Sequence, residues 1–306
     1  MAQYTLRQLE YFVAVAEAGS VTAAAQEIHL SQSALSTALV ELERTLGVQL
    51  LLRHHARGVT LSAAGEELLA AARNLLRQAD ELADQARGLG HDLTGTLHLA
   101  CFGVLAPYVL PEILAEAAAH FPGLEINTSE VDLAELTEGV ARGRFELAIG
   151  YDLAPDARLS MTPLRRLAPY ILLPHNHRLA KRRRVKLHEL SHEPLALLDL
   201  PHSREYFAGI FESAGVNPLV RYRSTSAATC RAIVARGLAY TLLNVRPRHD
   251  SEGNDQAVVA VDIADQAPSL GVVVMKAEGA RATRRMAAVQ GLIEDVVQRG
   301  GIGAGQ

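Results

Sequence analysis

The sequence predicts an α/β protein with a helical, winged helix-turn-helix domain at the N-terminus and a larger domain of two Rossmann-like, parallel-sheet lobes. Residues 1–90 contain no proline and are rich in Ala, Leu, Glu and Gln, a composition that favours helices. After Gly95, apolar strand-like stretches alternate with helical segments, which is typical of parallel sheets covered on both faces. A chain of 306 residues is also too long for one ordinary core.

The composition indicates a soluble, globular protein. Hydrophobic residues make up 49% of the chain, and no apolar run reaches the roughly 18 residues of a membrane span. The N-terminus lacks a charged start followed by an apolar block, so we expect a cytoplasmic protein without a secretory signal. The net charge of −4 argues against a general binder of polyanions, so any nucleic-acid surface must be local.

The first 46 residues predict three helices in a helix-turn-helix arrangement. The first helix carries one apolar stripe at helical spacing, formed by Leu9, Phe12, Val13 and Ala16. It ends at Gly19, and Ser20 can cap a second helix that runs through Ile28. After a tight turn, Ser31 is a good N-cap for a third helix.

The third predicted helix has an apolar side and a polar side. At 100° per residue, the packing side carries Leu35, Leu39, Leu42 and Leu46. The other side, which is left for a partner, carries Gln32, Ser33, Ser36, Thr37 and Val40. Two short β-type stretches follow and flank a basic tip that contains Arg53 and Arg57. A hairpin with a basic tip beside a helix-turn-helix predicts a wing.

A long helix is predicted from Ser62 toward Arg87. Leu68, Leu75 and Leu82 are seven residues apart along it, a seam that favours packing against a second copy. A helix that lies on its own domain is the alternative, because an apolar stripe does not name its partner. The expected boundaries are 1–61 for the winged domain, 62–90 for the linker helix, 91–94 for a hinge, 95–300 for the two-lobed domain (lobe I 95–163 and 267–300, lobe II 164–266) and 301–306 for a flexible tail.

The two lobes are expected to enclose a ligand cleft. The stretch from about Ser160 to Pro174 contains two strand-like runs with no helix between them, as expected where the chain crosses between lobes. The last strand and helix can then return to the first lobe. Ligands of open α/β sheets bind beyond the carboxyl ends of the strands, so two facing lobes predict a cleft.

At this point the residues carry a family likeness. The segment SVTAAAQEIHLSQSALSTALVELERTLGVQLLLRHHARGVTLSAAGEELL resembles the DNA-binding segment of the LysR-type transcriptional regulators. The likeness continues through GTLHLACFGVLAPYVLPEIL, ELAIGY and VARGLAYTLLN, and spans roughly Leu6 to Val297. It implies a non-enzymatic regulator with a type 2 periplasmic-binding-protein-like effector domain. Its partners would be double-stranded promoter DNA, a small-molecule effector and further copies of itself, as a dimer through the linker helix and as a tetramer.

The resemblance implies that the third helix enters the major groove of DNA. The residues expected at the DNA are Gln32, Ser33, Ser36, Thr37 and Val40 of the helix, and Arg53 and Arg57 of the wing. Gln can pair bidentately with adenine, and Arg suits phosphates or a narrow minor groove. An exposed polar helix face is the alternative interpretation of Gln32 and Ser36.

The chain departs from the family pattern in its charge. Members commonly carry Pro where Ser33 stands, and no Lys or Arg lies between Ser31 and Leu42. Residues 1–65 contain four arginines and five glutamates. We therefore expect weak DNA binding by a single domain with a shallow salt dependence, and affinity that comes from several domains engaged at once.

By resemblance, the effector is contacted by strand ends and helix starts of both lobes. The expected contacts are Gly103, Val104, Ser129, Glu130, Tyr151, His202, Ser203, Arg204, Thr225, Ser226 and Asn244. Helix N-termini favour anions, so these residues predict a small anionic or polar metabolite. Ser203 can instead be a helix N-cap, and His202 a solvated loop residue. Many relatives carry Ser or Thr where Val104 stands, which weakens the expectation of a benzoate-like ligand.

Other motifs are not expected to carry chemistry. The string HELSH at 188–192 matches H-E-x-x-H, which on a helix would place two imidazoles on one face for zinc. Pro194 follows two residues after the string and no third ligand has the expected spacing, so we expect no metal and no cofactor. The basic run Lys181–Arg184 is expected to be a solvated loop.

The sequence disfavours two other classes of protein. A solute-binding module without DNA function is disfavoured by the N-terminal helix-turn-helix, and an enzyme by the lack of a convergent nucleophile, base and orienting group. The two cysteines, Cys101 and Cys230, are far apart and lack a C-x-x-C pattern. They suit reduced, packed thiols, with a redox switch as the alternative.

Overall fold

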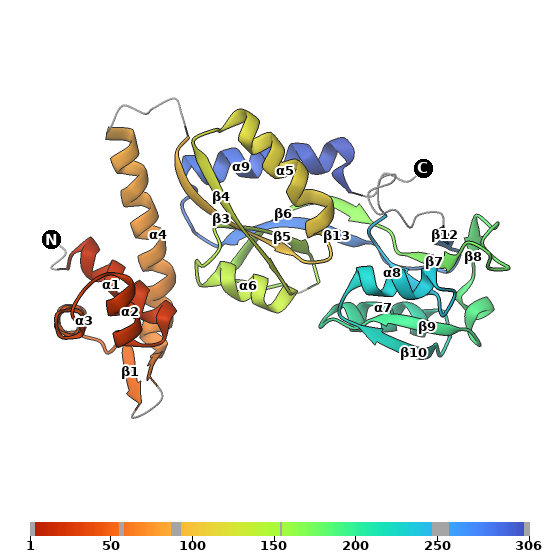
Figure 1. The fold of residues 1–306 in the computed structure, drawn as a ribbon, viewed down its shortest axis with the longest axis horizontal. Coiled ribbons are helices and arrows are strands. Elements are labelled where there is room, and N and C mark those ends of the chain that lie inside the picture. The colour runs from red at the N-terminus through yellow and green to blue at the C-terminus, as the bar shows by residue number, and fades with distance from the viewer. Residues whose placement is uncertain (1–3, 55–57, 87–92, 154, 247–256, 303–306) are drawn as a thin grey trace.

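A computed structural model of the chain describes residues 4–54, 58–86, 93–153, 155–246 and 257–302 (Figure 1). A helical N-terminal domain packs on the long helix α4, and lobe I lies between α4 and lobe II (Figure 1). The N-terminal elements are α1 (Leu6–Ala18), α2 (Val21–Glu27), α3 (Gln32–Leu46), β1 (Leu51–His54), β2 (Gly58–Leu61) and α4 (Ala63–Ala86).

The predicted helix-turn-helix is confirmed. Thr5, Ser20 and Ser31 are the N-caps of α1, α2 and α3, and each side-chain oxygen accepts a hydrogen bond from a backbone N–H of the first turn. Leu9, Phe12, Val15, Leu35, Leu39 and Leu42 are buried together in the N-terminal core. Val15 takes the buried position in α1, while Val13 of the predicted stripe is only partly buried.

The wing is a short antiparallel hairpin of β1 and β2, in which Arg53 pairs with Val59 and His54 with Gly58. Gly58 has a φ of +81° and lies against the end of α1, where a Cβ atom would clash with the carbonyl oxygen of Gly19. The Val59 N–H donates to that same oxygen at 2.8 Å. The wing is therefore fixed to the first helix through its glycine.

The apolar seam of α4 is buried in the first half of the helix and exposed in the second half. Leu69 and Ala72 are buried in the N-terminal core, so the first turns lie on their own domain. Leu75 and Leu82 remain 39% and 67% exposed. The second half of α4 therefore carries apolar side chains that are available to a second copy.

Lobe I is a five-stranded sheet in the order β4-β3-β5-β13-β6. Its strands are β3 (Gly95–Phe102), β4 (Leu124–Val131), β5 (Leu147–Tyr151), β6 (Leu159–Leu167) and β13 (Leu270–Ala277). Its helices are α5 (Ala106–His120), α6 (Leu133–Ala141) and α9 (Arg284–Val296). Ile302, which the sequence places in a loose tail, is buried in the core of this lobe.

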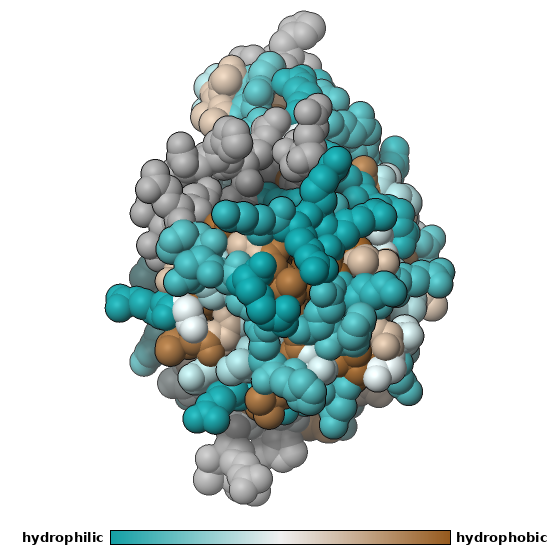
Figure 2. Space-filling view, turned by 90° about the vertical axis from the view of Figure 1, so that its right-hand side faces the viewer, coloured by the Kyte–Doolittle hydropathy of each residue, from teal (hydrophilic) through white to brown (hydrophobic). Residues whose placement is uncertain are grey.

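Lobe II contains a sheet in the order β11-β7-β12-β8 and the parallel pair β10-β9. Its strands are β7 (Tyr170–Pro174), β8 (Arg184–Val185), β9 (Pro194–Leu198), β10 (Leu219–Ser224), β11 (Thr241–Leu243) and β12 (Val258–Ile263), and its helices are α7 (Ser203–Ser213) and α8 (Ala227–Ala235). Figure 2 views this end of the molecule, where strongly hydrophilic side chains gather around the middle of the face.

The α/β class is confirmed, but the sheets are mixed rather than wholly parallel. β13 runs antiparallel to β5 and β6, and β7 runs antiparallel to both β11 and β12. These reversals occur where the chain crosses between lobes, because a strand that enters directly from the other lobe has no crossover helix to turn it parallel. No helix within the described ranges is both long enough and apolar enough to cross a membrane.

Candidate nucleic-acid interface and effector cleft

The polar side of α3 is open to solvent at the N-terminal end of the helix. Gln32, Ser33, Thr37 and Val40 are exposed, and Ser36 is partly buried at its edge. The Thr37 hydroxyl donates to the Ser33 carbonyl at 2.9 Å, which satisfies that hydroxyl within the helix. Within the described chain, no hydrogen bond is formed by the side chains of Gln32 and Ser36. These two groups are available to an external partner.

The wing residues can be placed only in part. Arg53 lies in β1, and its backbone is paired across the hairpin. Its side chain and the whole of Arg57 lie outside the described residues. Their expected contacts with DNA therefore stay predictions.

A cavity of about 550 Å³ lies where lobe I and lobe II face each other. Five of the residues expected at the effector line it: Gly103, Val104, Glu130, Thr225 and Ser226. Three helices, α5, α6 and α8, begin at this cavity. The N-cap of α5 makes no side-chain cap bond, whereas Ser226 caps α8 by accepting from the Thr229 N–H at 3.3 Å.

The cavity is lined by carboxylates. Glu130, Asp132 and Glu135 contribute to its wall, and no lysine or arginine does so among the residues described there. Asp132 is occupied as the N-cap of α6, accepting from the Glu135 N–H at 2.8 Å, and Glu135 pairs with Arg144 at 2.6 Å. Glu130 makes no side-chain hydrogen bond or ion pair in the described structure, so its carboxylate is the one left for a ligand.

Several expected contacts lie outside the cavity wall. Ser129 lies within β4, paired with Ala100 of β3. Tyr151 is buried in lobe I, where its ring meets Phe102 edge to face at 5.5 Å. The hydrogen-bond donor of Asn244 is already used, because its Nδ2 donates to Tyr206 Oη at 2.9 Å.

The start of α7 differs from the expectation that Arg204 meets an anionic ligand. Arg204 instead donates to Asp199, which Arg223 also approaches at 3.3 Å. The hydrogen bond from Arg204 lowers the pKa of the Asp199 carboxyl below its usual value. Ser203 is not the N-cap: that position is His202, which has a φ of +63°, while Ser203 is buried inside the first turn.

The sequence reasoning missed other lining residues, namely Phe102, Pro107, Tyr108, Glu135, Leu200, Ala227 and Ala228. Phe102 and Ala227 are direct neighbours of an expected contact, and Pro107, Tyr108 and Ala228 lie in the first turn of the helix that follows one. Extending each expected contact by one helical turn would have found Pro107, Tyr108, Ala227 and Ala228.

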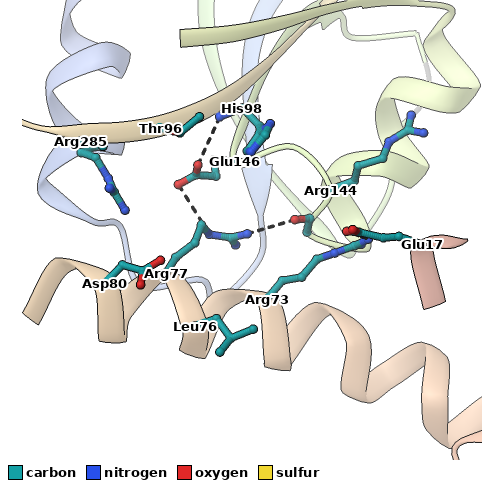
Figure 3. Close-up of a pocket in the computed structure, with 12 residues that line it drawn as sticks. Glu17, Arg73, Leu76, Arg77, Asp80, Thr96, His98, Arg144, Glu146 and Arg285 are labelled. Atoms are coloured by element: carbon teal, nitrogen blue, oxygen red, sulfur yellow. Dashed lines mark hydrogen bonds and ion pairs between the residues drawn. The ribbon is translucent and has the colours of Figure 1, made fainter. Parts of the chain in front are cut away.

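A second polar cavity, of about 560 Å³, lies at the junction of α4 with lobe I (Figure 3). Arg77 of α4 reaches into it, with Nε 3.5 Å from Oε2 of Glu146 and Nη1 donating to the Gly143 carbonyl at 3.0 Å. The Glu146 side chain is 1% exposed, and its Oε1 accepts from the His98 N–H at 3.2 Å. Burial lowers the pKa of the Arg77 guanidinium.

The same junction connects three parts of the chain. Arg73 of α4 donates to the Arg142 carbonyl of lobe I at 2.8 Å and pairs at 2.7 Å with Glu17 of α1. Arg142 in turn pairs with Glu66 of α4 at 2.7 Å. Direct polar contacts therefore join lobe I to α4, and Arg73 also joins α4 to the N-terminal domain.

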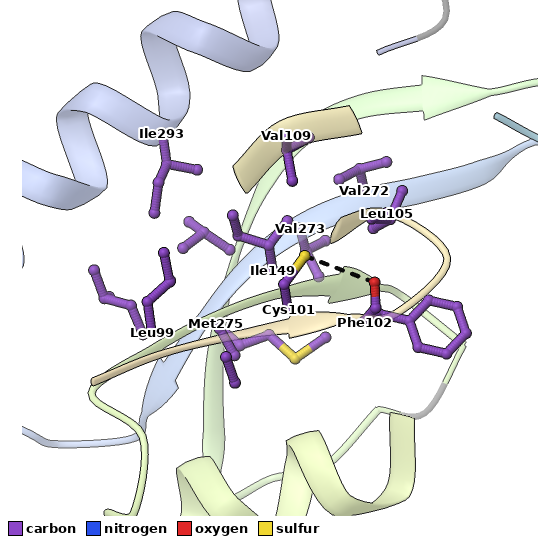
Figure 4. Packing of buried hydrophobic residues seen from close by; sticks show 14 of the residues in the cluster. Leu99, Cys101, Phe102, Leu105, Val109, Ile149, Val272, Val273, Met275 and Ile293 are labelled. Atoms are coloured by element: carbon purple, nitrogen blue, oxygen red, sulfur yellow. Dashed lines mark hydrogen bonds between the residues drawn. The ribbon is translucent and has the colours of Figure 1, made fainter. Parts of the chain in front are cut away.

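The two cysteines lie in separate cores. Cys101 is buried in lobe I among Leu99, Ile149 and Val273 (Figure 4), and Cys230 is buried in lobe II. Burial raises the pKa of the Cys101 thiol far above its usual value, and that of Cys230 to about 11. Neither sulfur is an accessible thiolate at neutral pH.

The H-E-x-x-H string does not lie on an α-helix. It begins on a short 3₁₀ turn, Leu187–Leu190, and its Glu189 pairs with Arg182 at 2.9 Å. No group of three potential metal ligands is present among the described residues.

A winged helix-turn-helix that is fixed through one long helix to a two-lobed domain with an inter-lobe cavity defines a ligand-responsive, DNA-binding regulator. Comparison with known proteins gives the family. Residues 6–66 match the model of the bacterial regulatory helix-turn-helix proteins of the lysR family, and residues 90–298 match the LysR substrate binding domain. The chain belongs to the LysR family of transcriptional regulators. It is a DNA-binding regulator with an effector domain and not an enzyme, and such regulators form oligomers.

Curated relatives share the family over most of their length. The chain is 34% identical over 239 residues to a hydrogen peroxide-inducible genes activator of Dickeya chrysanthemi. The matched region covers 78% of each chain. The chain is 35% identical over 243 residues to a probable activator of the same name in Mycobacterium avium, covering 79% of this chain and 78% of that one.

Solved structures agree with the fold. HinK, a LysR family regulator of Pseudomonas aeruginosa, is 33% identical with a TM-score of 0.63, over 96% of this chain and 98% of that chain. Full-length OxyR C199D, also from Pseudomonas aeruginosa, has a TM-score of 0.77 at 21% identity over the whole of both chains, which shows the likeness of fold.

Proposed function

We propose that this regulator reads promoter DNA with α3 in the major groove, and that a small polar effector in the inter-lobe cleft controls its action in the cytoplasm. Two observations together support the proposal. Exposed Gln32 and partly buried Ser36 form no side-chain hydrogen bond within the described chain, and the effector domain of the same chain has an inter-lobe cavity. We place the winged domain, the linker helix and the hinge at the predicted limits 1–61, 62–90 and 91–94. The effector domain begins at 95, as predicted, but it includes Ile302, which is buried in lobe I, and β6 extends lobe I to Leu167 rather than 163.

The lining of the cleft favours the polar alternative over an anionic one. Glu130 is the carboxylate left for a ligand, and the cation that would have held an anion, Arg204, is paired with Asp199. Opposing helix N-termini still supply N–H donors for a ligand carbonyl or hydroxyl. A neutral or amine-bearing metabolite with both donors and acceptors satisfies these groups.

We propose that two copies pair along the second half of α4. Leu75 and Leu82 are exposed there at heptad spacing, which suits a coiled-coil contact. A two-fold dimer places two recognition helices on related half-sites, so the target is an interrupted palindrome. Further association into a tetramer would add the avidity that a domain with few basic residues needs.

The peroxide response named for the curated relatives is not proposed for this chain. Peroxide oxidises thiolates, and burial raises the pKa of the Cys230 thiol to about 11, so this thiol is protonated at neutral pH. Cys101 has a still higher pKa and lies in the other lobe. We propose that reversible effector binding, rather than disulfide formation, switches this protein.

Thiol labelling of the folded chain tests that distinction. Iodoacetamide at pH 8 should modify neither cysteine, and as the pH is raised Cys230 should react before Cys101, because its thiol pKa is the lower. Mass spectrometry after labelling provides the readout, and unfolding in guanidinium should expose both. Formation of a Cys101–Cys230 disulfide in dilute hydrogen peroxide would contradict the proposal.

DNA binding tests the role of α3. A Gln32→Ala, Ser36→Ala variant should bind fragments selected from genomic DNA by the wild-type protein ten- to a hundredfold more weakly, or about 1–3 kcal/mol, because it loses base-edge contacts. Fluorescence anisotropy at fixed salt measures this loss. Gln26→Ala, an exposed change on α2, is the matched control. Equal selectivity of the double variant and the control would refute the assignment.

A further inference from the structure

An arginine-lined cavity of about 480 Å³ lies beside the crossover between the lobes. Its charged lining residues are Arg165, Arg166, Arg182, Arg183, Arg246 and Asp262. Five guanidinium groups thus face a single carboxylate. This arginine cavity is separate from the effector cleft, whose described wall contains carboxylates and neither lysine nor arginine.

Two of the arginines are partly neutralised by the protein itself. Arg246 pairs with Asp262 at 2.5 Å, and its guanidinium lies 4.8 Å from the centre of the Tyr170 ring. Arg182 pairs at 2.9 Å with Glu189, which lies outside the cavity wall. These contacts hold both guanidinium groups in place at the edge of the cavity.

The positive charges of the other three arginines, Arg165, Arg166 and Arg183, are less well balanced by carboxylates of the protein. Arg166 donates to the Ser269 carbonyl at 2.6 Å, and the nearest carboxylate, Asp152, is 3.8 Å away. Over the part of the chain that the structure describes, no ion pair or hydrogen bond is formed by the side chains of Arg165 and Arg183. The arginine cavity therefore carries excess positive charge and many N–H donors without acceptors.

We propose that the arginine cavity binds a compact, multiply charged oxyanion, of the kind presented by a phosphorylated or polycarboxylate metabolite. A guanidinium presents a planar fork of donors that matches phosphate and carboxylate oxygens in pairs. A single bound anion would also remove the mutual repulsion of the arginines. The arginine lining favours a ligand with more than one negative charge, because several guanidinium groups share one small cavity.

Because the arginine cavity lies between the two lobes, an anion bound there can control their relative orientation. Arg165 and Arg166 belong to β6 of lobe I, whereas Arg182, Arg183 and Arg246 belong to lobe II. Asn244, expected at the effector, lies in this cavity instead, with its Nδ2 3.3 Å from the Leu167 carbonyl. An anion held by both lobes would fix the angle between them, and so act on the effector cleft without entering it.

Calorimetric titration of the full-length protein tests the proposal. Pyrophosphate and citrate are the probes, at constant ionic strength, with acetate as the singly charged comparison. Saturable binding of pyrophosphate or citrate is expected, and an Arg165→Gln, Arg183→Gln variant should weaken it roughly 100-fold. An Arg221→Gln, Arg236→Gln variant, which removes two exposed charges outside the cavity, should change it less than about threefold.

The probes also separate the two chemical sources. A response to pyrophosphate alone assigns the cavity to phosphorylated metabolites, and a response to citrate alone assigns it to polycarboxylates. The proposal fails if neither anion saturates, if acetate binds as well as they do, or if both double variants lose binding equally. Circular dichroism melting of each variant confirms that the chain is folded.

Discussion

The junction cavity beneath α4 and the arginine cavity at the lobe crossover are both rich in arginine. They differ in how many carboxylates balance the positive charge of the arginines. At the junction, four arginines share the wall with three carboxylates, Glu17, Asp80 and Glu146. At the crossover, five arginines share the wall with Asp262 alone. The two cavities have similar volumes, so volume does not distinguish them.

The difference separates a structural use of arginine from a binding use. At the junction, Arg73 and Arg77 each donate to a backbone carbonyl and lie against a carboxylate of their own chain. Their charge is used to join the DNA-binding domain to the effector domain. At the crossover, Arg165 and Arg183 have no such partner within the described ranges, so their charge is left for something that arrives from solution.

Removal of Arg77 should have the largest effect. An Arg77→Met variant leaves Glu146 buried without its counter-charge, and should lower the free energy of unfolding by about 3–5 kcal/mol. Urea denaturation followed by circular dichroism measures the loss. An Arg77→Met, Glu146→Met variant should recover most of it, because neither charge is then buried alone.

A surface ion pair is the matched control. Arg158 pairs with Glu138 at 2.9 Å but is 56% exposed, so Arg158→Met should cost about 0–1 kcal/mol. The hydrogen bond from Arg158 lowers the pKa of Glu138, so any contribution of this pair is present above the unfolded pKa and is lost as the pH falls through the folded one. If Arg77→Met cost no more than Arg158→Met, the junction would not be a stabilising contact.

The sequence predicts the N-terminal domain well because its signals are local. Caps such as Ser20 and Ser31, and the spacing of Leu35, Leu39 and Leu42, are read within one or two helical turns. The effector cleft is only half predictable. The strand-end rule predicts a cleft between the lobes, whereas the resemblance to the LysR-type regulators implies its residues. Of these, the structure brings Gly103, Val104, Glu130, Thr225 and Ser226 to one cavity.

The remaining features depend on pairings that no local pattern carries. Arg204 was expected to face a ligand, but Asp199 and Arg223 decide its position, and Arg223 comes from a neighbouring strand. Arg77 and Glu146 are 69 residues apart, and their contact exists only after α4 meets lobe I. The arginine cavity likewise joins segments near 165, 183 and 246, so the basic run Lys181–Arg184 alone resembles an ordinary solvated loop.

The smallest expected effect is on the stability of the protein when the arginine cavity is altered and no anion is bound. Because Arg165 and Arg183 make no partner contacts in the described structure, an Arg165→Gln, Arg183→Gln variant in Tris chloride should unfold within about 0.5 kcal/mol of the wild type. At low salt it should be slightly more stable, since repulsion among the five guanidinium groups is relieved, and added salt should screen that repulsion and narrow the difference. Pyrophosphate should make the wild type more stable than the variant, because a ligand stabilises the state that binds it and only the wild type binds pyrophosphate tightly. A loss comparable to that of Arg77→Met in Tris chloride would mean that these arginines serve the fold, and the contrast between the two cavities would then not hold.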